Sequence, residues 1–157
     1  MNKRALLKGR DVISGSLAEC YLKIKDRRYN FMSGLDFEGS FEKTVSQVPI
    51  LGRTGKANKT TGWSGKYKMK VHYNTSIMRM LLLHYKDTGE DTYFEIQVTN
   101  EDPTSAIGRQ TVIFIDCLAN GGVLSKFDAK SEYLDEEIEG TFDDFKIPEE
   151  FTLLEGM

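Results

Sequence analysis

Hydrophobic and polar residues alternate along much of the chain, which is the pattern of β-strands with one buried face. Apolar residues occupy alternate positions between Leu35 and Glu42, and the segment Lys66 to Tyr73 repeats the pattern more regularly. Its odd-numbered positions are apolar, from Tyr67 to Tyr73. Its even-numbered positions are Lys66, Lys68, Lys70 and His72. The two segments therefore predict strands with one wet face.

Five further segments have strand-like patterns: 20–25, 92–99, 110–118, 123–129 and 138–145. Within the third, Val112 to Ile115 is continuously apolar, which predicts a strand covered on both faces. The sequence Asn120-Gly121-Gly122 predicts a hairpin turn, because residues free to take positive φ suit the tight turns that join antiparallel strands.

One segment has helical spacing instead, and it predicts an α-helix over about 75–87. Asn74 or Thr75 can cap its first turn, and Gly89 can end it. One face gathers apolar and aromatic side chains at helical spacing, namely Ile77, Met80, Leu81 and His84. We expect this face to pack across a sheet, which makes the fold mainly β, of α+β type, with one flanking helix.

The stretch 49–65 shows neither pattern. It contains four glycines and one proline, together with Arg53, Lys56 and Lys59. We therefore predict a long, basic, glycine-rich loop, a kind of segment that in compact domains is usually functional or disordered.

Length and composition predict one globular domain spanning 1–157, which includes an N-terminal arm at 1–12. The 157 residues are 39% hydrophobic and 29% charged, within the ordinary globular range. The first ten residues lack the apolar core and cleavage site of a signal peptide, and no stretch is long and apolar enough for a membrane anchor.

Charge is divided unevenly along the chain. Residues 1–80 hold 16 Lys and Arg against 6 Asp and Glu, whereas residues 81–157 hold 5 against 18. The oppositely charged segments can be neighbours within one domain, can join copies of the chain, or can meet another charged partner. Stable nucleic-acid binding is disfavoured, because such domains usually have a pI above about 9 and this chain has a pI near 5.5.

No catalytic, cofactor-binding or metal-binding set is predicted. His72 and His84 are the only histidines, and Cys20 and Cys117 are far apart, so no metal-ligand spacing is present. The neighbouring acids Glu136 and Glu137 point to opposite faces if they lie on a strand. The chain is therefore not expected to be an enzyme.

The order of these features resembles phage tail tube proteins of the XkdM type, found in PBSX-like prophages and contractile tails. The resemblance covers residues 13–151 and rests on segments that include the loop from Gly52 to Gly62, the run Met80 to Tyr85 and Asp91 to Phe94. It also includes the acidic finish from Leu134 to Glu149. The chain departs from the pattern in a longer lead, 1–12, and a longer stretch around 26–33.

The resemblance implies an antiparallel β-sandwich or barrel that assembles as hexameric rings. Such rings stack into the hollow inner tube of a contractile phage tail or phage-tail-like bacteriocin, inside a sheath. The implied partners are other copies of the chain, the tail sheath protein, baseplate and tail terminator proteins, and DNA passing transiently through the lumen. Synthesis in the host bacterial cytoplasm and assembly into an extracellular particle follow.

For a stacking subunit, the two charged segments become candidate contact surfaces between copies. The hypothesis places Arg53, Lys56 and Lys59 of one copy against Glu132, Asp135 and Glu136 of another. An acidic lumen lets DNA slide, so Glu137, Glu139 and Asp143 are candidates to face it, rather than Lys66, Lys68 and Lys70. The alternative function is a β-barrel module that binds a small ligand or nucleic acid on the lysine face.

Overall fold

A computed structural model describes residues 4–157, which divide into two compact units. Unit 1 contains the chain up to Met32 together with Tyr93–Asp116 and Phe145–Met157, and unit 2 contains Ser33–Thr92 and Cys117–Asp144. Each unit joins segments that are far apart in sequence. Of the predicted N-terminal segment at 1–12, the first three residues lie outside the described range. The remainder includes a short 3-10 helix, η1 (Gly9–Asp11).

Unit 1 is an antiparallel sheet in which β1 (Ala18–Ile24) pairs with both β2 (Arg27–Asn30) and β5 (Phe94–Glu101). The strand order continues from β5 to β6 (Arg109–Ala119), and β8 (Asp144–Glu149) pairs with β6. One face of the sheet is buried around Leu22, Phe94 and Ile96. The hydroxyl groups of Thr99 and Thr111 share a buried hydrogen bond of 3.0 Å.

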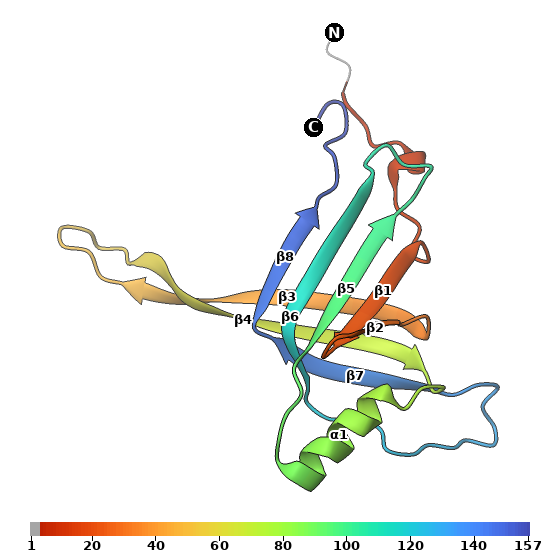
Figure 1. The fold of residues 1–157 in the computed structure, drawn as a ribbon. Helices are drawn as coiled ribbons and strands as arrows, with labels where there is room; N and C mark the ends of the chain where they lie inside the picture. Colours follow the sequence, from red (N-terminus) through yellow and green to blue (C-terminus); the bar gives the residue numbers. More distant parts are fainter. Residues whose placement is uncertain (1–3) are drawn as a thin grey trace. The chain divides into compact units, whose positions relative to one another are not determined.

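Unit 2 contains the two longest strands, β3 (Gly34–Val48) and β4 (Ala57–His72), which form an antiparallel hairpin. β7 (Asp135–Phe142) pairs with β4, and the last residues of β6 pair with β7. The helix α1 (Ile77–Thr88) follows β4. Figure 1 shows the hairpin of β3 and β4 extending well past the end of β7.

The alternation in β4 decides which side of unit 2 is buried. Tyr67, Met69 and Val71 are buried, and the lysines between them lie on the opposite, more exposed face, as predicted. Ile138 and Phe142 of β7 lie opposite Met69 and Gly65 of β4 and complete this buried face.

A glycine allows the strands of unit 2 to approach closely. A Cβ atom at Gly140 would lie 1.8 Å from the carbonyl oxygen of Leu118 in β6. The Tyr67 hydroxyl donates a 2.9 Å hydrogen bond to that same carbonyl. Only glycine fits between β6 and the Tyr67 side chain at this position.

The fold class is confirmed: the chain is mostly antiparallel β-structure with one α-helix in residues 4–157. The predicted strands at 20–25, 35–42, 66–73, 92–99 and 110–118 correspond to β1, β3, β4, β5 and β6. The short β2, which begins two residues after a tight turn with Lys25 at φ 56°, has no signal in the apolar pattern.

Four predictions about strands, turns and loops are wrong. Residues 123–129 form no strand, and Asn120-Gly121-Gly122 opens a long connection to β7 rather than a tight hairpin. The segment 138–145 is divided between β7 and β8, with Asp143 between them. The predicted loop at 49–65 is shorter than expected, because β4 already begins at Ala57.

The helix begins and ends close to its predicted limits. Gly89 ends α1 with φ 74° and donates its N–H to the carbonyl of Tyr85, the left-handed cap expected of glycine. At the other end the N-cap is Ser76, without a side-chain cap hydrogen bond. The predicted packing face is wrong in one respect: Met78 is buried, whereas Met80 is 57% exposed.

Candidate assembly surfaces

The distal part of the β3–β4 hairpin, residues 41–64, is here named the arm. β7 pairs with β4 from His72 back to Gly65, and the residues of β4 before Gly65 pair with β3. At about 3.4 Å per residue, β3 runs roughly 20 Å from Glu42 to its end at Val48. Two-stranded hairpins are marginally stable in water without a further strand or a packed face, so the arm is suited to contact with another chain.

A row of aromatic side chains runs from the core of unit 2 onto the arm. Phe142 is buried, and its ring occupies the space that a Cβ atom at Gly65 would need, with a separation of 2.3 Å. Trp63 lies 6.3 Å from Phe142 between ring centroids, and Phe41 stacks on Trp63 at 4.9 Å. Phe41 and Trp63 remain 45% and 41% exposed. The row is therefore covered at its inner end and only half covered on the arm.

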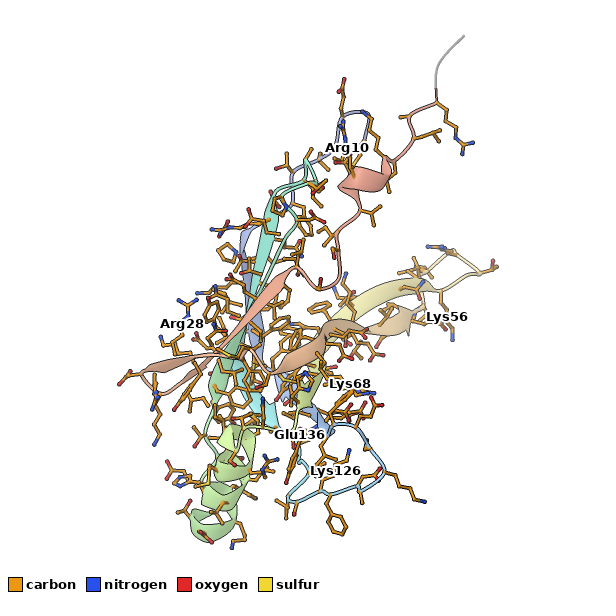
Figure 2. All side chains as sticks on the ribbon, turned by 90° about the vertical axis from the view of Figure 1, so that its right-hand side faces the viewer. Arg10, Arg28, Lys56, Lys68, Lys126 and Glu136 are labelled. Atoms are coloured by element: carbon orange, nitrogen blue, oxygen red, sulfur yellow. The ribbon has the colours of Figure 1, made fainter. Side chains whose placement is uncertain are left out.

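The tip of the arm, Pro49 to Lys56, combines apolar and basic side chains. Ile50 and Leu51 are exposed, and the chain turns through Gly52 with φ 80° while the Arg53 N–H donates to the carbonyl of Ile50. Arg53, Lys56 and Lys59 are exposed or nearly so, as predicted, although Lys59 lies on β4 rather than in a loop. Figure 2 labels Lys56 on the distal part of the hairpin.

The predicted acidic partners of the tip differ in what they can contact. Glu132 is exposed. Asp135 forms ion pairs within unit 2, at 3.5 Å to Lys70 and 3.8 Å to Lys126. Glu136 is 5% exposed, and its carboxylate lies 2.5 Å from Arg79 of α1. The assignment of Glu136 to a contact between copies is wrong, because this carboxylate is buried and already paired.

Arg79 connects α1 to the sheet through several contacts. Besides Glu136, its guanidinium donates to the carbonyl oxygens of Val123 and Thr75. It also lies over the ring of Tyr73, 4.5 Å from the centroid. Figure 2 shows Glu136 on the side of the sheet that faces α1. This buried pair was missed because Glu136 lies within a run of acids that reads as solvated.

The opposite side of unit 2 carries alternating columns of charge, here named the charged face. The register places Lys70 between Asp36 of β3 and Glu137 of β7, and Lys68 between Glu38 and Glu139. Lys68 lies 3.8 Å from both Glu137 and Glu139. Side chains directly opposite each other on paired strands share a face. Glu137 and Glu139, the lumen candidates, therefore share this face with the lysines that they were preferred to, and the face has one orientation for both sets.

This arrangement also disfavours the nucleic-acid alternative. Lys68 and Lys70 have carboxylates on both sides, while Lys66 lies between Ser40 and Thr141. Where β3 and β7 both flank β4, the charged face holds five acids (Asp36, Glu38, Asp135, Glu137 and Glu139) against three lysines. Tyr67, which alternates with the lysines along β4, is buried on the other face and offers no exposed ring for base stacking. Asp143 is exposed between β7 and β8.

Unit 1 has a buried carboxylate that the sequence did not indicate. Asp102 accepts hydrogen bonds from the backbone N–H groups of Ser14 and Thr104, at 3.1 and 3.0 Å, which hold its pKa below the usual range. Nearby, Asp11 accepts a hydrogen bond from the N–H of Ala106. The two carboxylates fasten the segment before β1 to the turn after β5.

Arg109, the first residue of β6, forms an ion pair with Glu149 in unit 1. Arg109 donates two hydrogen bonds to Glu149 of β8, at 2.5 and 3.0 Å. The hydrogen bond to Arg109 lowers the pKa of Glu149, and the same contact raises the pKa of Arg109. This exposed pair connects β6 with β8.

Within residues 4–157 no three His, Cys, Asp or Glu side chains are grouped as metal ligands. Burial raises the pKa of the Cys20 thiol to about 11, so little thiolate is present near neutral pH. No helix in this range has the length and apolarity to cross a membrane. Together with the arm, these features are typical of a structural protein that associates with other chains.

Comparison with known proteins identifies the class. Residues 5–149 match the model of a family described as phage tail tube protein. The chain is 32% identical over 146 residues to the phage-like element PBSX protein XkdM of Bacillus subtilis strain 168, covering 93% of this chain and 97% of that protein. The chain therefore belongs to the phage tail tube family.

Solved structures with similar folds come from contractile injection systems. A chain of the six-fold symmetrised anti-feeding prophage baseplate aligns with a TM-score of 0.61 and 12% identity, covering 94% of this chain and 97% of that one. A chain of an extracellular contractile injection system sheath/tube terminator aligns at 0.62 and 10%, covering 82% and 91%. At these identities the likeness concerns the fold.

Proposed function

We propose that the protein is the structural subunit of the inner tube of a contractile phage-type tail, assembling as stacked hexameric rings within a sheath. The observation that supports this function best is the arm, whose aromatic row is buried at Phe142 but half exposed at Phe41 and Trp63. A second copy packed on the arm would remove this apolar surface from water, which drives association.

The ring geometry is supported by the family and by the symmetry of a related assembly. A chain of similar fold belongs to a baseplate reconstructed with six-fold symmetry. The projecting arm differs from the rest of the subunit surface, so its contact with another copy is of the heterologous kind. Heterologous contacts form a ring when the rotation closes and a filament when it does not. A stack of rings needs contacts that close each ring and further contacts that continue from one ring to the next.

The charged face is our candidate for the lumen. Glu137 and Glu139 then face the lumen, as hypothesised from the sequence, and the lysines beside them face it as well. Its five carboxylates and three lysines give it a net negative charge. Such a surface repels DNA phosphates, and Lys68 and Lys70 have carboxylate neighbours that compete for them. DNA could therefore pass without being held. Asp143, exposed at the end of β7, is the third lumen candidate.

The partners follow from the tube role. We propose contacts with a tail sheath protein along the tube, with baseplate proteins at one end and with a terminator at the other. Synthesis in the bacterial cytoplasm would precede assembly into the particle. The role is structural rather than catalytic.

Charge reversal at the arm tip tests the function. Changing Arg53, Lys56 and Lys59 to Glu should abolish tube formation and leave a folded monomer, as seen by negative-stain microscopy, sedimentation and circular dichroism. Changing the exposed Lys23, Lys130 and Lys146 to Glu alters the net charge equally and should leave tubes intact. Normal tubes from the first variant would contradict the role of the tip, and a wild-type protein that stays monomeric at all concentrations and salts would contradict the tube function.

A further inference from the structure

The outward surface of α1 has an apolar part and an acidic part. Beside the first turns of the helix is a pocket of about 570 Å³, whose apolar lining includes Tyr73, Met80, Leu83 and Leu124. Met80 and Leu83 are 57% and 42% exposed. Asp87 follows on the same helical face, and Glu90 and Asp91 come directly after the helix; all three acids are exposed.

The acids lie at an electrostatically unfavourable end of the helix. The C-terminus of a helix carries a partial negative charge, which favours cations and disfavours carboxylates. Lys86 compensates in part through a 3.0 Å ion pair with Asp87, but both side chains are more than half exposed, and such pairs contribute little. A cationic partner at this end would therefore stabilise the helix as well as the contact.

The arm tip has the complementary arrangement. Ile50 and Leu51 are exposed aliphatic side chains at the turn, and Arg53 and Lys56 follow within five residues. Apolar side chains thus precede basic ones over a short distance, as the apolar pocket precedes the acids on α1. Both surfaces belong to unit 2.

The tip cannot reach α1 of its own chain. The tip joins β4 at Ala57, while the pocket begins just after the other end of that strand, at Tyr73. An extended strand of 16 residues separates its ends by about 50 Å. Any contact between the tip and α1 must therefore join two copies.

We infer that the arm tip of one copy docks on the outward surface of α1 of a second copy. Ile50 and Leu51 enter the pocket at Met80, Leu83 and Leu124. Arg53 and Lys56 lie against Asp87, Glu90 and Asp91. This contact rests on the proposed tube function and replaces the acidic segment at 132–136 as the surface that receives the tip.

A disulfide between two variants tests the contact directly. Leu51→Cys and Leu83→Cys subunits are mixed in equal amounts, assembled, and treated with diamide as the oxidant, which takes up the two electrons and two protons released as the S–S bond forms. Because a disulfide needs Cα atoms within about 7 Å, and about a quarter of the contacts in a random equal mixture join the two variants, we expect up to about half of the protein to become a dimer on non-reducing gels. The native Cys20 should stay unreactive, because burial raises its pKa to about 11.

Matched controls separate this inference from the tube function. A mixture of Leu51→Cys with Leu153→Cys, which is also exposed, measures random collision and should give only background dimer. Each single variant assembled alone should do the same. Tubes that form from the first mixture with no more dimer than these controls would overturn the docking site and leave the tube function standing. A wild-type chain that never assembles would overturn both.

Charge exchange gives a second readout that does not depend on thiols. Arg53→Glu with Lys56→Glu should prevent assembly, and Asp87→Lys with Glu90→Lys and Asp91→Lys should do so separately. Mixing the two variants restores opposite charges at half of the contacts, and joining all five substitutions in one chain restores them at every contact. Tubes from the five-fold variant are expected. Failure of that variant to assemble, with a folded monomer by circular dichroism, would count against the proposed partner surface.

Discussion

Single residues in unit 2 show how the same residue type takes different roles on neighbouring positions. Glu136 is buried against Arg79, whereas Glu137, the next residue, is exposed near Lys68. A strand sends successive side chains to opposite faces, so a run of acids is divided between core and surface. The buried carboxylate contributes to the position of α1 because its partner is a helix residue.

Removing the buried carboxylate should destabilise the fold. Glu136→Ala leaves the Arg79 guanidinium largely buried with only carbonyl and aromatic contacts, and breaking such a pair from one side costs about 3–5 kcal/mol. Glu137→Ala, an exposed neighbour, should change the free energy of unfolding by less than about 0.5 kcal/mol. Urea unfolding followed by circular dichroism measures both. Equal stability of the two variants would mean that the Arg79–Glu136 pair does not hold α1.

At the scale of elements, the β3–β4 hairpin does two things along its length. Its inner half is part of a sheet with β7, and Phe37 there stacks on the buried ring of Tyr67. Its outer half has the same two strands without a third. The stacked Phe41 and Trp63 are therefore more useful to a partner than to the monomer.

Polar replacement on the arm should separate assembly from folding. Phe41→Ser with Trp63→Ser removes half-exposed apolar surface, so the melting temperature should change little while tube formation is lost. Aromatic anchors in interfaces often cost 2 kcal/mol or more when truncated. Microscopy and differential scanning calorimetry give the two readouts, with Tyr133→Ser, an exposed aromatic outside the arm, as the control. A large loss of stability in the double variant would instead make the pair part of the monomer core.

At the scale of the whole molecule, the two signs of charge are far more mixed than the sequence suggests. Lysines from the basic half of the chain lie between acids from both halves on the charged face. What remains is a modest acidic surplus on one face and a basic arm tip. Both are suited to assembly, the first as a surface that does not hold DNA and the second as a contact between copies.

Inverting the charge of the proposed lumen should make it retain DNA. Glu137→Lys with Glu139→Lys changes the face from five acids and three lysines to three and five. Assembled tubes of this variant should retain short DNA in a filter assay, with retention that falls steeply as salt rises. Glu132→Lys with Glu150→Lys makes the same change of net charge at exposed positions elsewhere and should retain less. Equal retention by both variants would place the charged face outside the lumen.

Local signals in the sequence were sufficient for much of the fold. The alternation from Lys66 to Tyr73 correctly predicted which side of β4 is buried, and Gly89 correctly marked the end of α1. Each of these depends on residues within a few positions of one another, which is the range over which periodicity and capping act.

Tertiary structure alone decided what depends on distant partners. Residues 57–65 form a strand although their glycines and threonines look like a loop, because β3 supplies the hydrogen bonds and Phe142 fills the space above Gly65. Glu136 is buried because α1 brings Arg79 to it. Likewise, Glu139 is beside Lys68 only through the pairing of β4 with β7. The sequence by itself determined strands, helix and family resemblance, whereas register and long-range packing decided which charges remain available to another chain.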